Sequence, residues 1–263
     1  MTAKRFFINS NEINFPWTQI KGSEHHHLCH VLRKKPGDII IIFDERGVVY
    51  RGKIIDIEKQ QTSILLLDKQ PPPPREVMIN LGLGILKAKT MDLVIQKATE
   101  WGVARIWPLL TSRSVVKLGE KWEKKIIRWH QIAVEAAKQS GQVLLPQIKM
   151  PLSLEQFLEN CSAPRKYLLS ESSGELLWKV LEEMKGENTS GVDQLDKEVI
   201  LLIGPEGGWT EKEQNYMISH GFKAVSLGPY VLRAETAAIS SVAIIAHFFM
   251  REAGDVSAGS KSR

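Results

Sequence analysis

The stretch Glu198–Met250 reads EVILLIGPEGGWTEKEQNYMISHGFKAVSLGPYVLRAETAAISSVAIIAHFFM and contains two apolar runs that each break on glycine. Val199–Ile203 is followed by the loop Gly204–Gly208, and Ala224–Leu227 is followed by a loop that begins at Gly228. Glycine has no Cβ and tolerates positive φ, so such a loop lets the backbone approach a ligand closely. Two loops of this kind at the carboxyl ends of neighbouring strands predict the ligand site of an open α/β sheet.

Common nucleotide motifs do not explain these loops. Neither Gly208 nor Gly228 is followed by the Lys-Ser/Thr pair of a phosphate-binding P-loop, and the dinucleotide pattern GxGxxG is missing from the stretch. Either loop alone is also typical of a tight turn from strand to helix. The pair, with Arg233 and Glu235 at the start of the second helical pattern, favours a functional site.

The same stretch resembles a known family. LLIGPEGG and LGPYVLRAETAA are similar to the signature of the SPOUT methyltransferases, specifically the bacterial 16S ribosomal RNA uridine-N3 methyltransferases. The resemblance extends to MDLVIQKATEWGV at Met91–Val103, RSVVK at Arg113–Lys117, HLCHVLRKKPGD at His27–Asp38 and FDERG at Phe43–Gly47. It implies a C-terminal SPOUT-type parallel-sheet domain with a deep trefoil knot, an N-terminal PUA-like β-barrel, S-adenosylmethionine as methyl donor, and a homodimer.

Four consecutive prolines, Pro71–Pro74, predict a stiff extended connector between two domains. Before them, the short β-branched runs Asp38–Phe43, Val48–Ile57 and Thr62–Leu67 predict a small all-β domain over residues 1–72. After them, apolar strands alternate with helical patterns, which predicts an α/β domain with a parallel sheet over residues 76–250. We expect residues 251–263 to form a disordered tail.

Composition favours an ordinary soluble globular protein, with 43% hydrophobic and 25% charged residues. The first residues hold no apolar run of secretory-leader length, and Val242–Met250 is too short to span a membrane. Cys29 and Cys161 lie far apart in sequence, which argues against a disulfide and fits a cytoplasmic protein. The histidines at 25–27 and 30 lack a suitable Cys or carboxylate pattern, so we expect no metal.

Positive charge is concentrated near the N-terminus. Residues 1–75 hold 12 Lys and Arg against 8 Asp and Glu, whereas residues 76–250 hold 20 of each kind. The cluster Arg33-Lys34-Lys35 would attract phosphate, although a solvated turn explains it equally well by itself. With the resemblance, RNA binding becomes the better interpretation. The predicted RNA-binding residues are His27, Arg33, Lys34, Lys35, Arg113 and Lys117, and the implied partner is 16S ribosomal RNA or the assembled small subunit.

Adenine is flat and apolar, so aliphatic side chains from both loops can wall it while loop amides and carbonyls contact its edge. The residues assigned to the cofactor, partly by match to the family motif, are Leu202, Ile203, Gly204, Pro205, Glu206, Gly207, Gly208, Leu227, Gly228, Val231, Leu232 and Thr236. We expect a third contact from Leu168–Glu171, where a strand over Lys166–Leu169 ends.

Uridine N3 carries a proton at neutral pH, so its methylation needs that proton removed or the resulting anion stabilised. Arg233 is the leading catalytic candidate and Glu235 accompanies it; the alternative is that Arg233 forms an ion pair with a carboxylate such as Glu206. The chain departs from the family at KQSGQ, where Lys138 and Gln142 replace an acid and an arginine. Alternative functions are a related SPOUT methyltransferase acting on a ribose 2′-hydroxyl or on transfer RNA, and an inert RNA-binding homologue.

Overall fold

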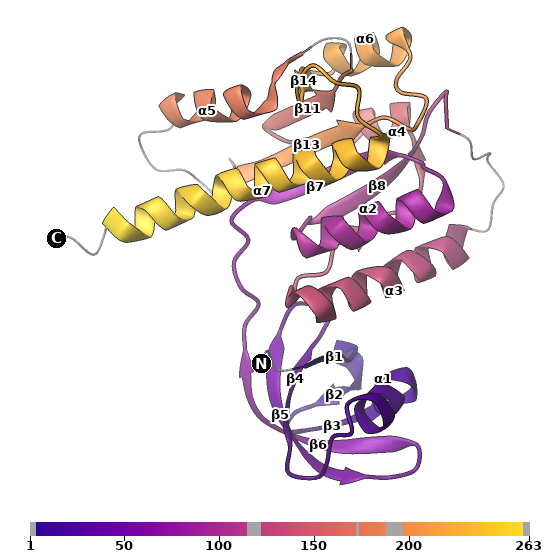
Figure 1. Cartoon of the computed structure of the whole chain (residues 1–263), viewed down its shortest axis with the longest axis vertical. Coiled ribbons are helices and arrows are strands. Elements are labelled where there is room, and N and C mark those ends of the chain that lie inside the picture. The colour runs from indigo at the N-terminus through magenta and orange to yellow at the C-terminus, as the bar shows by residue number, and fades with distance from the viewer. Residues whose placement is uncertain (1–3, 115–121, 172–173, 188–196, 260–263) are drawn as a thin grey trace. The chain divides into compact units, whose positions relative to one another are not determined.

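The computed structural model describes residues 4–114, 122–171, 174–187 and 197–259 (Figure 1). The contacts divide the chain into two compact units. The first unit comprises the residues up to Pro74 together with Val134–Leu145, and the second comprises Arg75–Ala133 and the residues from Pro146 onward. The sequence had assigned Val134–Leu145 to the second domain, whereas its contacts are with the first.

A curled, mainly antiparallel sheet forms the first unit, in the strand order β1-β4-β5-β6-β3-β2. Three of its strands fall on the predicted runs, which confirms the small β domain. The elements are β1 (Arg5–Phe7), η1 (Ser10–Glu12), β2 (Ile13–Asn14), β3 (Trp17–Lys21), α1 (Gly22–His26), η2 (His27–Val31), β4 (Ile39–Phe43), β5 (Val49–Ile57) and β6 (Gln61–Gln70). The alternating side chains of β3, β5 and β6 place Ile20, Ile54 and Ile64 in the core, since successive strand residues face opposite ways.

The segment Val134–Leu145 packs on this sheet through a separate cluster that includes Phe43 and Ala137. Lys138, which stands where the family has an acid, forms an ion pair with Glu24 of α1 at 2.5 Å and another with Glu135 at 2.8 Å. Burial opposes the charge of Lys138, but the two carboxylates outweigh it and raise its pKa. The Oε1 of Gln142 accepts hydrogen bonds from the amides of Val143 and Leu144. Both departures from the family pattern therefore have structural roles here.

The second unit contains a parallel sheet in the order β10-β8-β7-β13-β11-β14-β12, with β9 paired to β8. This confirms the predicted α/β class. Its elements are β7 (Met78–Gly84), α2 (Ala88–Glu100), β8 (Arg105–Leu110), α3 (Trp122–Ser140, which continues into the first unit), β9 (Gln147–Ile148), β10 (Leu152–Ser153), α4 (Leu154–Glu159), β11 (Arg165–Leu169), β12 (Glu175–Leu176), α5 (Leu177–Glu187), β13 (Glu198–Ile203), α6 (Glu211–Ser219), β14 (Lys223–Ser226) and α7 (Ala234–Gly259).

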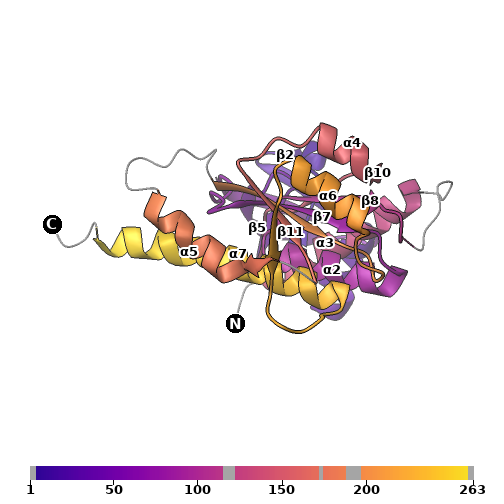
Figure 2. The same ribbon diagram turned by 90° about the horizontal axis from the view of Figure 1, so that it is seen from above.

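Helices cover both faces of this parallel sheet. Leu201 and Ile203 of β13 face the cluster formed with α2, α5 and α7, whereas Ile200 and Leu202 face the cluster formed with α4 and α6. Figure 2 shows α4 and α6 on the side of the strands away from α2 and α7. Such a sheet is buried on both faces, which explains why its strands are continuous apolar runs rather than alternating ones.

The strand order corrects one expectation. We predicted that the two strands leading into glycine loops are neighbours, but β11 lies between β13 and β14 and pairs with both. The carboxyl end of β11 therefore lies between the two loops. At the other end of the domain, α7 extends to Gly259, past the Met250 at which we expected the domain to end. Residues 260–263 lie outside the described residues.

The Lys138 ion pairs yield a stability test. Lys138→Met leaves the carboxylate of Glu24 without its cation, so we expect urea unfolding to show a loss of about 3 kcal/mol, as for a broken buried pair. The double variant Glu24→Gln/Lys138→Met should recover most of this loss. Lys124→Met, at an exposed position of the same helix, is the control and should be neutral. Because the folded-state pKa of Lys138 is raised, the contribution should persist at neutral pH and disappear only in strong alkali.

Candidate functional site

The first glycine loop connects β13 to α6 and folds back on itself. Gly208 has φ +67° and donates its amide hydrogen to the carbonyl of Pro205 at 2.8 Å. The loop also lies close to the end of β7, because a Cβ built on Gly84 would be 2.5 Å from the backbone nitrogen of Pro205. Glycine at 84 and at 208 is therefore required for two different reasons, close backbone approach and left-handed conformation.

A buried carboxylate fixes the end of this loop. Thr210 caps α6: its Oγ1 accepts from the amide of Glu213 at 3.2 Å, and Glu213 Oε2 accepts from the amide of Thr210 at 2.8 Å. The other oxygen, Oε1, accepts from the amide of Ser112 at 2.8 Å. Burial opposes ionisation of Glu213, but the hydrogen bonds from Ser112 and Thr210 outweigh it and lower its pKa. Glu213 thus joins the turn after β8 to the first glycine loop.

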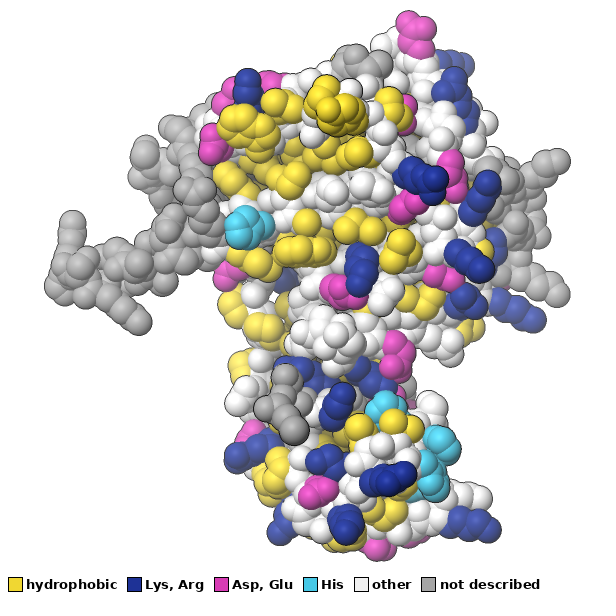
Figure 3. All heavy atoms as spheres, viewed as in Figure 1, with side chains coloured by type: hydrophobic (Ala, Val, Ile, Leu, Met, Phe, Trp, Pro, Cys, Tyr) yellow, Lys and Arg dark blue, Asp and Glu magenta, His cyan; other side chains and the backbone are white. Residues whose placement is uncertain are grey.

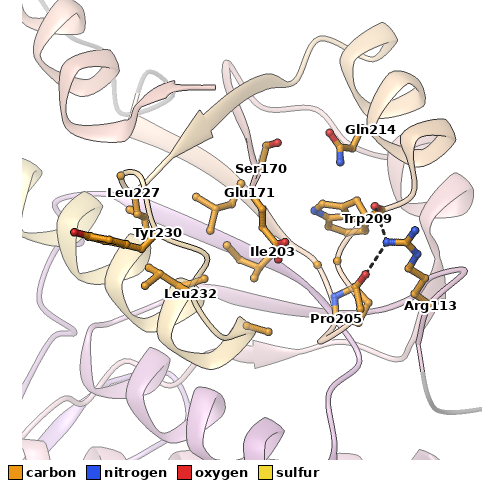
Figure 4. A pocket seen from close by; sticks show the side chains of 17 residues that line it. Arg113, Ser170, Glu171, Ile203, Pro205, Trp209, Gln214, Leu227, Tyr230 and Leu232 are labelled. Atoms are coloured by element: carbon orange, nitrogen blue, oxygen red, sulfur yellow. Dashed lines mark hydrogen bonds between the residues drawn. The ribbon is translucent and has the colours of Figure 1, made fainter. Parts of the chain in front are cut away.

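Arg113, next to Ser112, also links the turn after β8 to the first glycine loop. Its Nη1 donates to the carbonyl of Gly207 at 2.8 Å and to that of Trp209 at 3.4 Å (Figure 4). A Cβ on Gly207 would lie 3.1 Å from Cβ of Arg113, so a side chain there would first displace the arginine. The sequence predicted Arg113 as an RNA-binding residue; the structure places it on the rim of the pocket.

The second glycine loop connects β14 to α7. Gly228 has φ +137°, a conformation that side-chain-bearing residues rarely adopt. The loop residues Tyr230 and Val231 are 82% and 72% exposed, and Arg233 is also exposed. The end of β11 lies between the loops, where the amide of Ser170 donates to the carbonyl of Val225 at 2.9 Å.

These three strand ends enclose a cavity of about 200 Å³ (Figure 4). Its walls combine aliphatic side chains with loop backbone and a carboxylate, Glu171. The lining residues are Arg113, Leu169, Ser170, Glu171, Ile203, Gly204, Pro205, Gly207, Gly208, Trp209, Gln214, Leu227, Gly228, Tyr230, Leu232, Ala234 and Ala237. Such a mixture suits a ligand with an apolar ring and a few polar groups.

Most of the predicted cofactor residues line this cavity. The eight that do are Ile203, Gly204, Pro205, Gly207, Gly208, Leu227, Gly228 and Leu232. The other four do not: Leu202 is fully buried on the opposite face of the sheet, and Glu206, Val231 and Thr236 are exposed. Leu202 points away because the side chains of a strand alternate between faces, so it cannot share the side of Ile203.

The catalytic candidates lie beside the cavity, at the start of α7, rather than in its lining. In the part of the chain that the structure describes, no ion pair or hydrogen bond engages the Arg233 guanidinium. The proposed ion pair with Glu206 is not formed, because Glu206 Oε1 accepts instead from the backbone amide of Lys87 at 3.0 Å. Glu235 occupies the first turn of α7 and is half-buried.

The predicted RNA-binding residues of the first unit occupy varied positions. The His27 ring packs edge-on against Phe6, with 6.3 Å between centroids. Arg33 adopts φ +49° and Lys35 is exposed, whereas Lys34 lies 3.7 Å from the carboxylate of Asp38. The remaining predicted residue, Lys117, lies outside the described residues.

Sequence reasoning missed five lining residues: Trp209, Gln214, Tyr230, Ala234 and Ala237. Two of them could have been predicted from the sequence, because Trp209 directly follows the first loop and Tyr230 belongs to the second. Gln214, Ala234 and Ala237 line the cavity because helices α6 and α7 begin at its rim, which only the fold reveals.

Among the described residues, no group of three or more His, Cys, Asp or Glu side chains is arranged to hold a metal ion. None of the helices described is long and apolar enough to cross a membrane. Cys29 and Cys161 are both free thiols.

Comparison with known proteins identifies the two units. Residues 73–246 match the RNA methyltransferase domain model, and residues 20–67 match the RNA methyltransferase PUA domain model. The ribosomal RNA small subunit methyltransferase E of Bacillus subtilis is 31% identical, over 93% of this chain and 96% of that protein. The protein of the same name from Synechocystis is 30% identical, over 92% of this chain and 77% of that protein.

Solved structures of similar proteins are also methyltransferases. A methyltransferase of Legionella pneumophila with bound S-adenosylmethionine superposes with a TM-score of 0.80 at 28% identity, covering 93% of this chain and 97% of that one. A ribosomal RNA small subunit methyltransferase E from Neisseria gonorrhoeae, also bound to S-adenosylmethionine, superposes with a TM-score of 0.78 at 26% identity. The match covers 92% of this chain and 96% of that one. The predicted cofactor is thereby confirmed at the level of the family.

The parallel sheet, its cavity between glycine loops and the appended PUA domain define an RNA methyltransferase of the SPOUT type. Within that class, the chain belongs to the ribosomal RNA small subunit methyltransferase E family.

Gly208 tests whether the cavity is the cofactor site. A Cβ on Gly208 would lie 3.7 Å from Glu171 Oε1, at the cavity wall, so Gly208→Leu should lower calorimetric affinity for S-adenosylmethionine at least tenfold, a loss of about 1.4 kcal/mol. Gly221→Leu is the matched control, because Gly221 also has positive φ, +84°, but faces open space. Both variants should lose similar stability, and equal cofactor affinities would contradict this assignment.

Glu213 gives a pH-dependent test. An amide cannot accept the hydrogen bonds of both Ser112 and Thr210 as a carboxylate does, so Glu213→Gln should reduce the free energy of unfolding by about 1–3 kcal/mol at pH 7. Because the folded-state pKa is lowered, this contribution is complete above about pH 4.3, the ordinary value, and is lost as pH falls through the folded-state pKa. Urea titrations at pH 7 and at a pH below the folded-state pKa measure this contribution to the free energy of unfolding. Glu211→Gln, exposed in the same helical turn, should show no such difference.

Proposed function

We propose that this protein transfers the methyl group of S-adenosylmethionine to N3 of a uridine in 16S ribosomal RNA, in the decoding region of the small subunit. The observation that carries the proposal is the cavity between the two glycine loops, in a chain that belongs to a family of ribosomal RNA methyltransferases. The PUA domain match supports RNA as the partner. We place this activity in the cytoplasm, where small-subunit RNA is found.

The chemistry of the cavity lining supports S-adenosylmethionine as the ligand. Ile203, Leu227 and Leu232 can hold the adenine between apolar surfaces, and the backbone of both loops can contact its edge. Glu171 is the acidic side chain in the lining and can complement the positive sulfonium or accept from the ribose hydroxyls. When bound, S-adenosylmethionine supplies an electrophilic methyl group attached to sulfur.

The residues of this chain then have to hold the uracil and manage its charge. The N3 proton would pass to a carboxylate or to water, and N3 would then take the methyl group from sulfur, with S-adenosylhomocysteine as the leaving group. Arg233, exposed at the cavity mouth and free of ion pairs within the described residues, can stabilise the uracil anion with its planar guanidinium. Glu235 accompanies it as the second catalytic candidate. His27, Arg33, Lys34, Lys35, Arg113 and Lys117 remain the proposed RNA contacts.

We also propose a homodimer and a trefoil-knotted C-terminal domain, as the family implies. Exposed apolar side chains support the dimer: Tyr230 and Val231 of the second loop and Met250 of α7. Figure 3 shows hydrophobic side chains gathered over the surface where α5 and α7 lie in Figure 1. An apolar patch of this kind on a folded protein favours association.

Nucleoside mass spectrometry tests the proposed reaction. The protein is incubated with S-adenosylmethionine and either 16S ribosomal RNA or assembled small subunits from a strain that lacks it. We expect N3-methyluridine to form, and comparison of the two substrates identifies the acceptor. Methylation of a ribose 2′-hydroxyl or of transfer RNA would contradict the proposal, as would cofactor binding without any methyl transfer.

Arg233 provides the mechanistic test. Arg233→Ala should reduce turnover by about 10²-fold or more, the scale for losing one preorganised group that stabilises charge in the transition state. Affinity for S-adenosylmethionine should change little, since a cation does not assist the binding of a sulfonium. Arg233→Lys should restore activity only in part, because a point charge does not match the planar fork. Lys212→Ala, an exposed cation of α6, is the control. Parallel loss of cofactor affinity and turnover would make Arg233 a support for the loop instead.

A further inference from the structure

The outward face of the sheet in the first unit carries a continuous row of side chains. Trp17 of β3 lies opposite Leu65 of β6, Leu65 lies opposite Lys53 of β5, and Lys53 lies opposite Ile39 of β4. Paired residues of neighbouring strands point to the same face, so these four side chains form one line across four strands. Their sequence neighbours Ile54 and Ile64 point the other way, into the core.

Large parts of this row are open to solvent. Trp17 is 50% exposed, and Phe15, in the turn between β2 and β3, is 52% exposed. Lys69 Nζ lies 5.8 Å from the centroid of the Phe15 ring. We name the six residues Phe15, Trp17, Ile39, Lys53, Leu65 and Lys69 the aromatic strip. An exposed apolar surface of this kind marks an interaction site.

Two of the six strip residues are lysines, and the acid Asp56 of β5 also lies on the outward face, opposite Ser63. Lys53 lies within the row and Lys69 contacts the Phe15 ring, while the acid Asp68 forms an ion pair with Arg51 at 2.7 Å. Residues 1–75 as a whole carry 12 basic against 8 acidic side chains. Figure 3 shows basic side chains spread over the first unit. The strip therefore presents flat aromatic rings next to two lysines that form no ion pair with any residue the structure describes.

We propose that the aromatic strip is a stacking platform for unpaired nucleotides of the RNA substrate. Bases stack on exposed Trp and Phe rings irrespective of sequence, and lysines reach the phosphates between them. A protein partner fits less well, because the cores of protein interfaces are depleted of lysine and Lys53 lies within the row. The proposal rests on the proposed function only in taking RNA as the partner, and it adds a surface distinct from Arg33–Lys35.

Fluorescence anisotropy of the full-length protein with a single-stranded oligoribonucleotide of about 16 nucleotides tests the platform. Trp17→Ala should weaken binding about tenfold, which corresponds to one lost stacking contact of about 1.4 kcal/mol. Trp17→Phe should keep most of the affinity, because a ring remains. Lys53→Ala should make the slope of log K against log salt shallower by about 0.7, the value for one phosphate contact on a single strand. Met150→Ala is the control, a comparably exposed apolar side chain (49%) in the second unit.

Cofactor affinity and methyl transfer separate this proposal from the proposed function. With RNA as variable substrate, Trp17→Ala should raise KM and leave kcat unchanged, while S-adenosylmethionine binds as before. If the wild type transfers no methyl group but Trp17→Ala still weakens RNA binding, the platform stands and the proposed function fails. Unchanged RNA affinity in folded Trp17→Ala would overturn the platform. So would a variant that binds naked RNA normally but loses affinity for assembled subunits, because the strip would then contact protein.

Discussion

The candidate site depends on the buried carboxylate of Glu213, which accepts hydrogen bonds from the turn after β8 and from the cap of α6. These two segments are about 100 residues apart in sequence, so Glu213 is a long-range connection between them. A charged acceptor for several backbone and hydroxyl donors is worth more than neutral hydrogen bonds, and its lowered pKa shows that the donors outweigh burial. With Glu213 in place, Arg113 reaches the carbonyls of Gly207 and Trp209 and the first glycine loop is fixed from outside.

A second constraint is the order of the strands. Because β11 separates β13 from β14, three strand ends rather than two converge on the cavity, and the middle one contributes Leu169, Ser170 and Glu171. The aliphatic lining residues come from all three strand ends, since Ile203 ends β13, Leu169 ends β11, and Leu227 and Leu232 belong to the loop after β14. This arrangement places the cavity at the carboxyl edge of a parallel sheet, where open α/β sheets bind their ligands, and Arg233 lies beside it at the start of α7.

Much of this could be predicted from sequence, because the informative signals are local. The apolar runs and the helical patterns predicted the α/β class, the short β-branched runs predicted the small β domain, and the family resemblance supplied the cofactor. Long-range pairing could not be predicted: the insertion of β11 depends on contacts between distant segments, and so does the association of Val134–Leu145 with the β domain through Lys138 and Glu24. Leu202 was misplaced for a simpler reason, since its neighbour Ile203 already occupies the cavity side of the strand.

A structure of the protein with S-adenosylmethionine bound tests the central claim most directly. Our account predicts the adenine between the two glycine loops, in contact with Ile203 and Leu227, and the methyl group directed toward the start of α7. Arg113 should keep its hydrogen bonds to Gly207 and Trp209 in the complex. Cofactor density in the second cavity, lined by Asn80, Arg105 and Glu198 at the opposite edge of the sheet, would contradict the account. So would a complex in which the first loop must separate from Arg113 to admit the cofactor.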